Sequence, residues 1–189
     1  MIAQQDLYFL SPDNYLQQEA KSTQKHDYID GEILAIAGVS SAHCTIVATL
    51  TALLLKSVRQ QGCQLFTGYM KVRVDRHNCF YYPDLLVTCD PRDQNTDYYK
   101  CFPKLIIEVL SDSTELHDRG EKFFNYSALE SLEEYVLISQ DKMRVECFRR
   151  DDNNRWVLEW YGPGDRVFFH SIDWQGMVND LYEDVSLPG

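Results

Sequence analysis

The chain has 189 residues with 18 basic and 29 acidic side chains, so its formal net charge at pH 7 is −11. That length suits one domain with a sizeable core, and 44% hydrophobic with 25% charged residues is the composition of a globular rather than a disordered chain. The negative charge argues against broad electrostatic attraction to nucleic acid or anionic membranes, although a local basic patch or metal ions could still hold nucleic acid.

The sequence shows no segment typical of export or of a membrane span. Residues 1–10 lack the basic start and long apolar run of a signal peptide, and the most apolar segment, residues 45–55, is too short to cross a bilayer. The six cysteines are scattered without a CxxC pair, which argues against structural zinc. We therefore predict a cytoplasmic protein that does not contact membranes and whose cysteines are reduced.

Cap and turn residues predict the first elements. The Ser-Pro pair at residues 11–12 indicates the start of a short helix. Residues 26–38 alternate around an Asp-Gly pair, which predicts a strand, a tight turn and a second strand. A long helix is expected from Ser40 or Ser41 to about Gln61, with a glycine as its stop signal. Its buried face is predicted from apolar residues at helical spacing, which are Ile46, Leu50, Leu53, Leu54 and Val58.

The middle of the chain is dominated by strands. Residues 70–74 alternate between apolar and basic, which predicts a half-exposed strand. We expect a turn at residues 75–78 and the return strand of a hairpin over residues 79–89. After a polar loop, residues 104–110 form a nearly continuous apolar run, as expected for a central strand covered on both faces.

A strand–helix–strand unit is predicted next. Asp112 is expected to cap a helix that ends near Ser127, because Glu115 follows it at capping-box spacing. Residues 133–139 predict another buried strand. The unit from residue 105 to 138 should therefore be parallel and right-handed.

The order of elements predicts an α/β or α+β fold with a mixed sheet flanked by helices. A hairpin is expected at each end of the chain, the C-terminal one over residues 142–162. We predict a single domain over residues 1–189, with a core at about 28–140 and a C-terminal hairpin extension at about 141–189.

Two carboxylates interrupt sheet-forming runs. Asp84 follows Pro83, a residue that belongs at a strand edge, bend or bulge because it lacks an N–H. Glu108 shares a strand face with Ile106 and Leu110, where an ionised carboxylate is unfavourable without a cation. Two such groups on neighbouring strands suit a hard divalent cation such as Mg²⁺. The alternative is that Asp84 closes a turn and Glu108 pairs with a basic side chain.

A lysine can be placed near this pair by chain length. From Glu108 to Asp112 a strand advances roughly 13 Å, and from Asp112 to Lys122 a returning helix covers roughly 15 Å. Lys122 should therefore lie above Glu108. Its helical neighbours Asp118 and Tyr126 leave open the alternative of a solvated face with an Asp118–Lys122 pair.

These residues carry a family resemblance. The dipeptide PD at 83–84 followed by EVL at 108–110 resembles the PD-(D/E)XK nuclease superfamily. The segments YIDGEI, YYPDLLVTCDP and PKLIIEVLSDSTELHDRGEKFFNYSALESLEEYVLI resemble a large bacterial family of uncharacterised restriction-endonuclease-like proteins, over roughly residues 10 to 160. The resemblance implies a restriction-endonuclease-like core and phosphodiester cleavage with Mg²⁺, for which Mn²⁺ could substitute.

The resemblance also implies roles for single residues. Asp84 and Glu108 would hold the metal ion, and a lysine would orient or activate the attacking water. This chain departs from the superfamily pattern because Leu110 occupies the usual lysine position, so the resemblance assigns that role to Lys122. Glu32 matches a further acidic position that would contact the metal or its water, with a turn-flanking surface residue as the alternative.

Three more residues are candidates of lower weight. His43 could activate the nucleophile, with capping or a core hydrogen bond as the alternative. Asp118 and Arg119 could support Lys122 or contact phosphate, or simply occupy a solvated helix face. Four tyrosines could stack on bases, although packing is the simpler role; they are Tyr81, Tyr82, Tyr98 and Tyr99.

Together these features predict a Mg²⁺-dependent endonuclease that hydrolyses phosphodiester bonds in nucleic acid, with DNA as the expected substrate and a homodimer as the expected assembly. The alternative is a catalytically inactive protein of the same fold that binds nucleic acid or a protein partner, which the negative charge favours. A third alternative is an assembly role in which exposed aromatic residues form a dimer surface.

Overall fold

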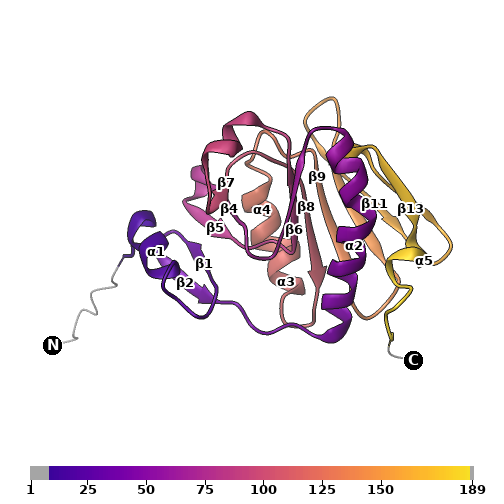
Figure 1. Cartoon of the computed structure of the whole chain (residues 1–189), viewed down its shortest axis with the longest axis horizontal. Helices are drawn as coiled ribbons and strands as arrows, with labels where there is room; N and C mark the ends of the chain where they lie inside the picture. Colours follow the sequence, from indigo (N-terminus) through magenta and orange to yellow (C-terminus); the bar gives the residue numbers. More distant parts are fainter. Residues whose placement is uncertain (1–8, 188–189) are drawn as a thin grey trace.

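The computed structural model describes residues 9–187, in which two large β-sheets and a two-stranded ribbon are flanked by helices (Figure 1). Its helical segments are α1 (Pro12–Glu19), α2 (Ser41–Gln60), η1 (Asp75–His77), η2 (Pro91–Asn95), α3 (Glu115–His117), η3 (Asp118–Lys122), α4 (Phe123–Tyr126), η4 (His170–Ile172) and α5 (Val178–Leu181). This is the mixed α+β architecture that the order of predicted elements indicates.

The larger sheet has six strands in the order β11-β10-β9-β8-β6-β3. In chain order they are β3 (Gln64–Thr67), β6 (Leu85–Thr88), β8 (Pro103–Leu110), β9 (Glu134–Ser139), β10 (Val145–Arg150) and β11 (Trp156–Tyr161). β8 and β9 are parallel, and every other neighbouring pair in this sheet is antiparallel. The sheet is therefore mixed, with β8 near its centre, as predicted.

The second sheet has five strands in the order β2-β1-β5-β4-β7. They are β1 (His26–Ile29), β2 (Glu32–Ala35), β4 (Lys71–Val74), β5 (Cys79–Tyr81) and β7 (Tyr99–Lys100), while β12 (Arg166–Phe169) and β13 (Trp174–Met177) form the separate ribbon. The predicted C-terminal hairpin is the β10–β11 pair of the six-stranded sheet.

Short-range signals in the sequence place several element ends correctly. Ser11 and Ser40 cap α1 and α2, each accepting a hydrogen bond from a backbone N–H three residues later. The β1–β2 turn holds Asp30 and Gly31 at φ of 43° and 99°, the left-handed conformation that a two-residue hairpin turn requires. Gly62 ends the α2 region at φ of 71°.

The α2 helix packs one face on the six-stranded sheet. Its buried residues Ile46, Leu50, Leu54 and Val58 belong to the larger core cluster, which also contains residues from β6, β8 and β9. By length and composition alone this helix could cross a membrane. Packing of the apolar face against the sheet is the behaviour of a core helix.

Strand β8 has both faces covered. Leu105, Ile107 and Val109 pack in the cluster with α2, whereas Ile106 and Leu110 pack on the opposite side with residues of α4 and the five-stranded sheet. Figure 1 shows α2 on one side of β8 and β9, with α3 and α4 on the other. The face that carries Glu108 is therefore roofed by α3, η3 and α4.

The predicted return strand at residues 79–89 is wrong as a single strand. The chain leaves the five-stranded sheet after β5 and enters the six-stranded sheet at β6, with Tyr82, Pro83 and Asp84 between them. Pro83 has no N–H for a sheet ladder, which explains why pairing stops at this point. The predicted bend at the proline thus becomes a transfer between two sheets.

Strand β4 is more buried than its alternating pattern predicts. Lys71 is only 7% exposed, and its Nζ donates to Tyr82 Oη over 3.2 Å. The prediction that Lys71 lies on an exposed strand face is therefore wrong. The segment between β5 and β6 places Tyr82 next to the Lys71 ammonium group and shields it from solvent.

The helix after β8 differs from its prediction in its start and its regularity. Asp112 does not cap it; α3 begins at Glu115, whose N–H donates to Ser111 O over 2.9 Å. The Ser111 hydroxyl group forms hydrogen bonds with the hydroxyl groups of Ser113 and Thr114. These bonds stabilise a turn over residues 111–114, so the helix cannot begin at Asp112. The middle of the segment is the π-helical η3, and the predicted end near Ser127 is correct.

The expectation that all cysteines are reduced is wrong for one pair. Cys63 and Cys89 form a disulfide with a Cα–Cα distance of 4.2 Å. They extend the antiparallel β3–β6 ladder by one position beyond Gln64 and Thr88, so the strand register brings them face to face. Among the described residues, the other four cysteines are free, and Cys79 and Cys147 are buried.

Candidate active site

The antiparallel register of β6 and β8 brings the two predicted carboxylates together. Leu85 lies opposite Ile107, so Asp84, one residue before β6, lies beside Glu108. The Asp84 N–H donates to Glu108 Oε2 over 3.3 Å. The predicted proximity of the two carboxylates is confirmed, although Asp84 precedes β6 rather than lying within a strand.

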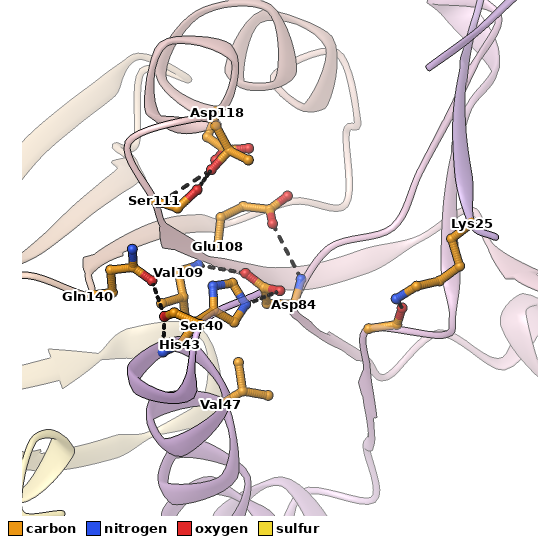
Figure 2. Close-up of polar contacts among 12 residues, drawn as sticks. Lys25, Ser40, His43, Val47, Asp84, Glu108, Val109, Ser111, Asp118 and Gln140 are labelled. Atoms are coloured by element: carbon orange, nitrogen blue, oxygen red, sulfur yellow. Dashed lines mark hydrogen bonds and ion pairs between the residues drawn. The ribbon is translucent and has the colours of Figure 1, made fainter. Parts of the chain in front are cut away.

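Asp84 is held from two sides (Figure 2). Its Oδ2 accepts a hydrogen bond from Val109 N at 2.7 Å, and its Oδ1 lies 2.8 Å from His43 Nε2. An ionised carboxylate can only accept, so the proton of this second bond resides on His43 Nε2. His43, in the first turn of α2, therefore fixes the orientation of Asp84, whose side chain remains 21% exposed.

Glu108 is buried under the helical roof. Its Oε1 accepts from Lys122 Nζ at 3.2 Å and from Tyr126 Oη at 3.3 Å. Lys122 Nζ also lies 3.0 Å from Asp118 Oδ1. The predicted position of Lys122 above Glu108 is confirmed. The alternative Asp118–Lys122 pair is present as well, but both of its side chains are buried rather than solvated.

The charges in this cluster are unbalanced. Four carboxylates, on Asp27, Asp84, Glu108 and Asp118, line one cavity with Lys122, and the ammonium group of Lys122 is influenced by three of them, Glu108, Asp27 and Asp118. Burial raises the pKa of Glu108 well above its usual range, with Asp118 and Asp84 adding to the rise and Lys122 opposing it. Burial alone would lower the pKa of Lys122, but the surrounding carboxylates outweigh it and hold that pKa well above its usual value. The cluster therefore keeps its lysine charged and retains an excess of negative charge.

These groups line a cavity of about 520 Å³. Asp27 of β1 reaches it too, although the sequence reasoning did not single it out. Asp27 accepts from Tyr82 N over 3.0 Å, and burial raises its pKa while Lys122 opposes the rise. The available signal was an aspartate flanked by strand residues, the same pattern that drew attention to Glu108. The remaining lining comes mainly from residues 34–40 and 111–114.

Two predicted candidates lie elsewhere. Glu32 is exposed on β2, opposite Ile29, and does not line the cavity, which matches the alternative of a turn-flanking surface residue. Arg119 pairs with Glu115 at 2.7 Å and with Glu146, so its guanidinium is directed away from the carboxylate cluster. The strand pattern could not reveal that Asp27, near the open end of the hairpin, reaches the cavity whereas Glu32, beside the turn, does not.

The four tyrosines that were candidates for base stacking differ in how exposed they are. Tyr81 is buried and accepts a hydrogen bond from Asn125 Nδ2 at 2.6 Å, so it serves packing. Tyr82 lines the cavity, and Tyr99 is half-buried in β7. Tyr98 is 72% exposed and is thus the member of this group with an open ring.

A second depression of about 720 Å³ lies on another part of the surface. Three of its basic side chains are neutralised by close acidic partners, in the pairs Arg73–Asp75, Arg92–Asp90 and Lys104–Glu133. This depression is larger than the carboxylate cavity. Most of its acidic side chains are already paired with basic ones, so it lacks the excess of negative charge that would bind a cation.

The carboxylate cavity suits a hard cation that keeps part of its water shell. Mg²⁺ needs only one or two carboxylates from the protein, and Glu108 Oε2 and both oxygens of Asp84 have one hydrogen-bond partner each, which leaves a lone pair on each of them. Within residues 9–187, no three His, Cys, Asp or Glu side chains form a ready-made cage for a metal ion. The donor set therefore fits Mg²⁺ or Mn²⁺ held by two carboxylates.

Comparison with known proteins places this geometry in a family. The chain is 33% identical over 177 residues to an uncharacterized protein of Synechocystis, covering 94% of this chain and 93% of that protein. A second uncharacterized Synechocystis protein is also 33% identical, over 163 residues and 85% of this chain and 92% of its own length. The crystal structure of a "putative nuclease belonging to DUF820" from Anabaena variabilis has the same fold, with a TM-score of 0.73, 18% identity, and coverage of 90% of this chain and 96% of that one. Residues 12–172 match the family Uma2, described as "Putative restriction endonuclease", and the chain belongs to that family.

Proposed function

We propose that this protein is a Mg²⁺-dependent nuclease that hydrolyses phosphodiester bonds in DNA. The observation that carries the proposal is the excess of buried carboxylate over cationic charge in a cavity where Asp84 remains open to solvent. The scissile phosphate could not enter such a cluster without a divalent cation between them.

Asp84 and Glu108 would hold the metal ion in this proposal. When bound, the metal would supply Lewis acidity toward water and toward the scissile phosphate. His43 and Val109 N–H orient Asp84, while Lys122, Tyr126 and Asp84 N–H orient Glu108.

Lys122 has the second role in the proposed reaction. Its ammonium group is kept charged by Glu108 and Asp118, and it lines the same cavity as both proposed ligands. From there it would hold the attacking water in place or neutralise charge that develops on the phosphate. Asp118 positions Lys122 rather than touching the substrate.

The direct test is cleavage of single- and double-stranded DNA in Mg²⁺ or Mn²⁺. We expect wild type to cut and the double variant Asp84→Ala/Glu108→Ala to lose activity. The matched control is Glu32→Ala, which removes an exposed carboxylate outside the cavity and should leave cleavage unchanged. Equal background from wild type and the double variant would overturn the proposal.

Calorimetry with Mn²⁺ distinguishes the nuclease from an inactive binding protein of the same fold. The nuclease requires Mn²⁺ binding that disappears in Asp84→Ala/Glu108→Ala. Absence of Mn²⁺ binding to wild type, combined with intact nucleic-acid binding, would favour the inactive alternative.

A further inference from the structure

An exposed turn is attached directly to the backbone of Asp84. Gly68 N donates to Asp84 O over 3.0 Å, and Gly68 O accepts from Lys25 Nζ at 2.8 Å. Met70 N returns to Thr67 O over 3.2 Å and closes the turn. Figure 2 shows Lys25 on a segment to one side of the Asp84 cluster. Residues 67–70 thus form a turn that hydrogen bonds hold next to the candidate active site.

The turn at residues 67–70 exposes the aromatic ring of Tyr69 to solvent. The Tyr69 side chain is 82% exposed, and the Lys25 ammonium group lies 4.4 Å from its ring centroid. The same Lys25 ammonium lies 5.6 Å from the ring centroid of Tyr82, which lines the carboxylate cavity. The Lys25 ammonium group therefore lies near both the exposed ring of Tyr69 and the ring of Tyr82 at the cavity wall.

A second open ring lies at the same end of the sheet. β4 and β7 are parallel, with Lys71 opposite Tyr99. Tyr98 immediately precedes β7 and is 72% exposed, so it enters the sheet beside the end of β4 that follows Tyr69. Tyr69 and Tyr98 thus flank the start of β4, next to the turn whose Gly68 N–H bonds to Asp84 O.

We propose that Tyr69, Lys25 and Tyr98 form a binding site for single-stranded nucleic acid that leads into the carboxylate cavity. This inference rests on the proposed function and names its substrate class. Aromatic faces stack on any base, and a neighbouring lysine contacts the backbone phosphate. Bases in a duplex are already stacked on each other, so open tyrosine rings favour a single strand.

The charge of the whole chain supports recognition by stacking. At a net charge of −11, long-range electrostatics repel a polyanion, so affinity must come from contacts that do not depend on net charge. Stacking on tyrosine provides such contacts, and Lys25 supplies a local positive charge at the point where the strand enters.

The test is fluorescence anisotropy in EDTA with a labelled oligothymidylate, an oligouridylate and a duplex of the same length. Wild type should bind both single strands more tightly than the duplex. Tyr69→Ala should weaken single-strand binding about tenfold, whereas Tyr69→Phe, which keeps the stacking face, should bind like wild type. Lys25→Met should reduce the slope of log affinity against log salt by about 0.7, the value for one phosphate contact.

Trp160→Ala provides the matched control, because Trp160 is also an exposed aromatic residue at 67% but lies on β11. No binding by wild type, or equal affinities for wild type and Tyr69→Ala, would overturn the inference. Because EDTA removes the metal, binding is measured independently of cleavage. If the Tyr69 variants behave as expected but wild type cuts no DNA, the nuclease proposal fails and the single-strand site stands.

Discussion

Glu108 is the residue on which the electrostatics of the cavity depend most strongly. It is 2% exposed on a central strand, and its one cationic partner in the described structure, Lys122, is shared with Asp118. Burial of that carboxylate raises its pKa and disfavours its charged form, while Lys122 opposes the rise. A residue kept for metal binding would therefore reduce the stability of the folded chain without the metal.

We predict that Glu108→Gln stabilises the metal-free protein by about 1 kcal/mol at neutral pH. The folded-state pKa of Glu108 is raised, so its stabilising protonated form is present below the unfolded pKa and is lost as pH rises through the folded pKa. The advantage of the variant should grow as the pH rises above about 4.3, the ordinary pKa of glutamate. Urea unfolding at several pH values measures this, and a wild-type stability that rises as steeply with pH as the variant's would contradict it.

His43 gives a prediction about positioning. Its Nε2–H holds Asp84 Oδ1, so His43→Ala should weaken Mn²⁺ binding about tenfold or more by freeing that carboxylate to rotate. His43→Gln, whose amide can donate in the same direction, should recover part of the affinity. Calorimetry compares the three proteins, and equal Mn²⁺ affinity in wild type and His43→Ala would show that the contact does not orient a ligand.

At the scale of elements, the site depends on two irregularities. The break between β5 and β6 frees Asp84 from both sheets, and the π-helical η3 carries Asp118 and Lys122 into the roof of the cavity. Short π-helical segments are commonly found at functional sites because they redirect side chains within a helix. A regular strand and a regular α-helix would have placed these groups differently.

The disulfide joins the start of β3 to the end of β6, the strand that follows Asp84. It closes a loop with a sequence separation of 26 residues, so Cys63→Ser/Cys89→Ser should lower the free energy of unfolding by about 3 kcal/mol. Dithiothreitol should lower the melting temperature of wild type but not of that variant. The control is Cys44→Ser/Cys101→Ser, which removes two free thiols and should keep the response to the reductant. A wild type indifferent to reductant would show that this bond contributes nothing to stability.

At the scale of the whole molecule, the proposed metal binding would be linked to folding. A divalent cation that binds the folded cluster shifts the folding equilibrium, by about 2.7 kcal/mol at a concentration 100 times its Kd. We therefore predict that Mn²⁺ raises the melting temperature of wild type and leaves that of Asp84→Ala/Glu108→Ala unchanged. Differential scanning fluorimetry measures both, and equal shifts in the two proteins would place the bound ion outside the cavity. Monovalent salt at matched ionic strength is the control for general screening.

The sequence by itself determined the features that depend on near neighbours. Serine caps, the Asp-Gly turn and the alternation of Ile106, Glu108 and Leu110 act over a few residues, where φ and ψ preferences and side-chain direction decide the outcome. Lys122 could be placed over Glu108 because a short β–α connection leaves few paths back across the sheet.

Only the tertiary structure decided which distant segments meet. Asp27 enters the cavity and Glu32 does not, because the fold brings the open end of the β1–β2 hairpin, where Asp27 pairs with Leu34, to the cavity, while Glu32 pairs with Ile29 beside the turn. Cys63 and Cys89 pair because the register of β3 and β6 aligns them, and the Pro83 break divides one apolar run between two sheets. These outcomes depend on packing between segments tens of residues apart, which no local preference encodes.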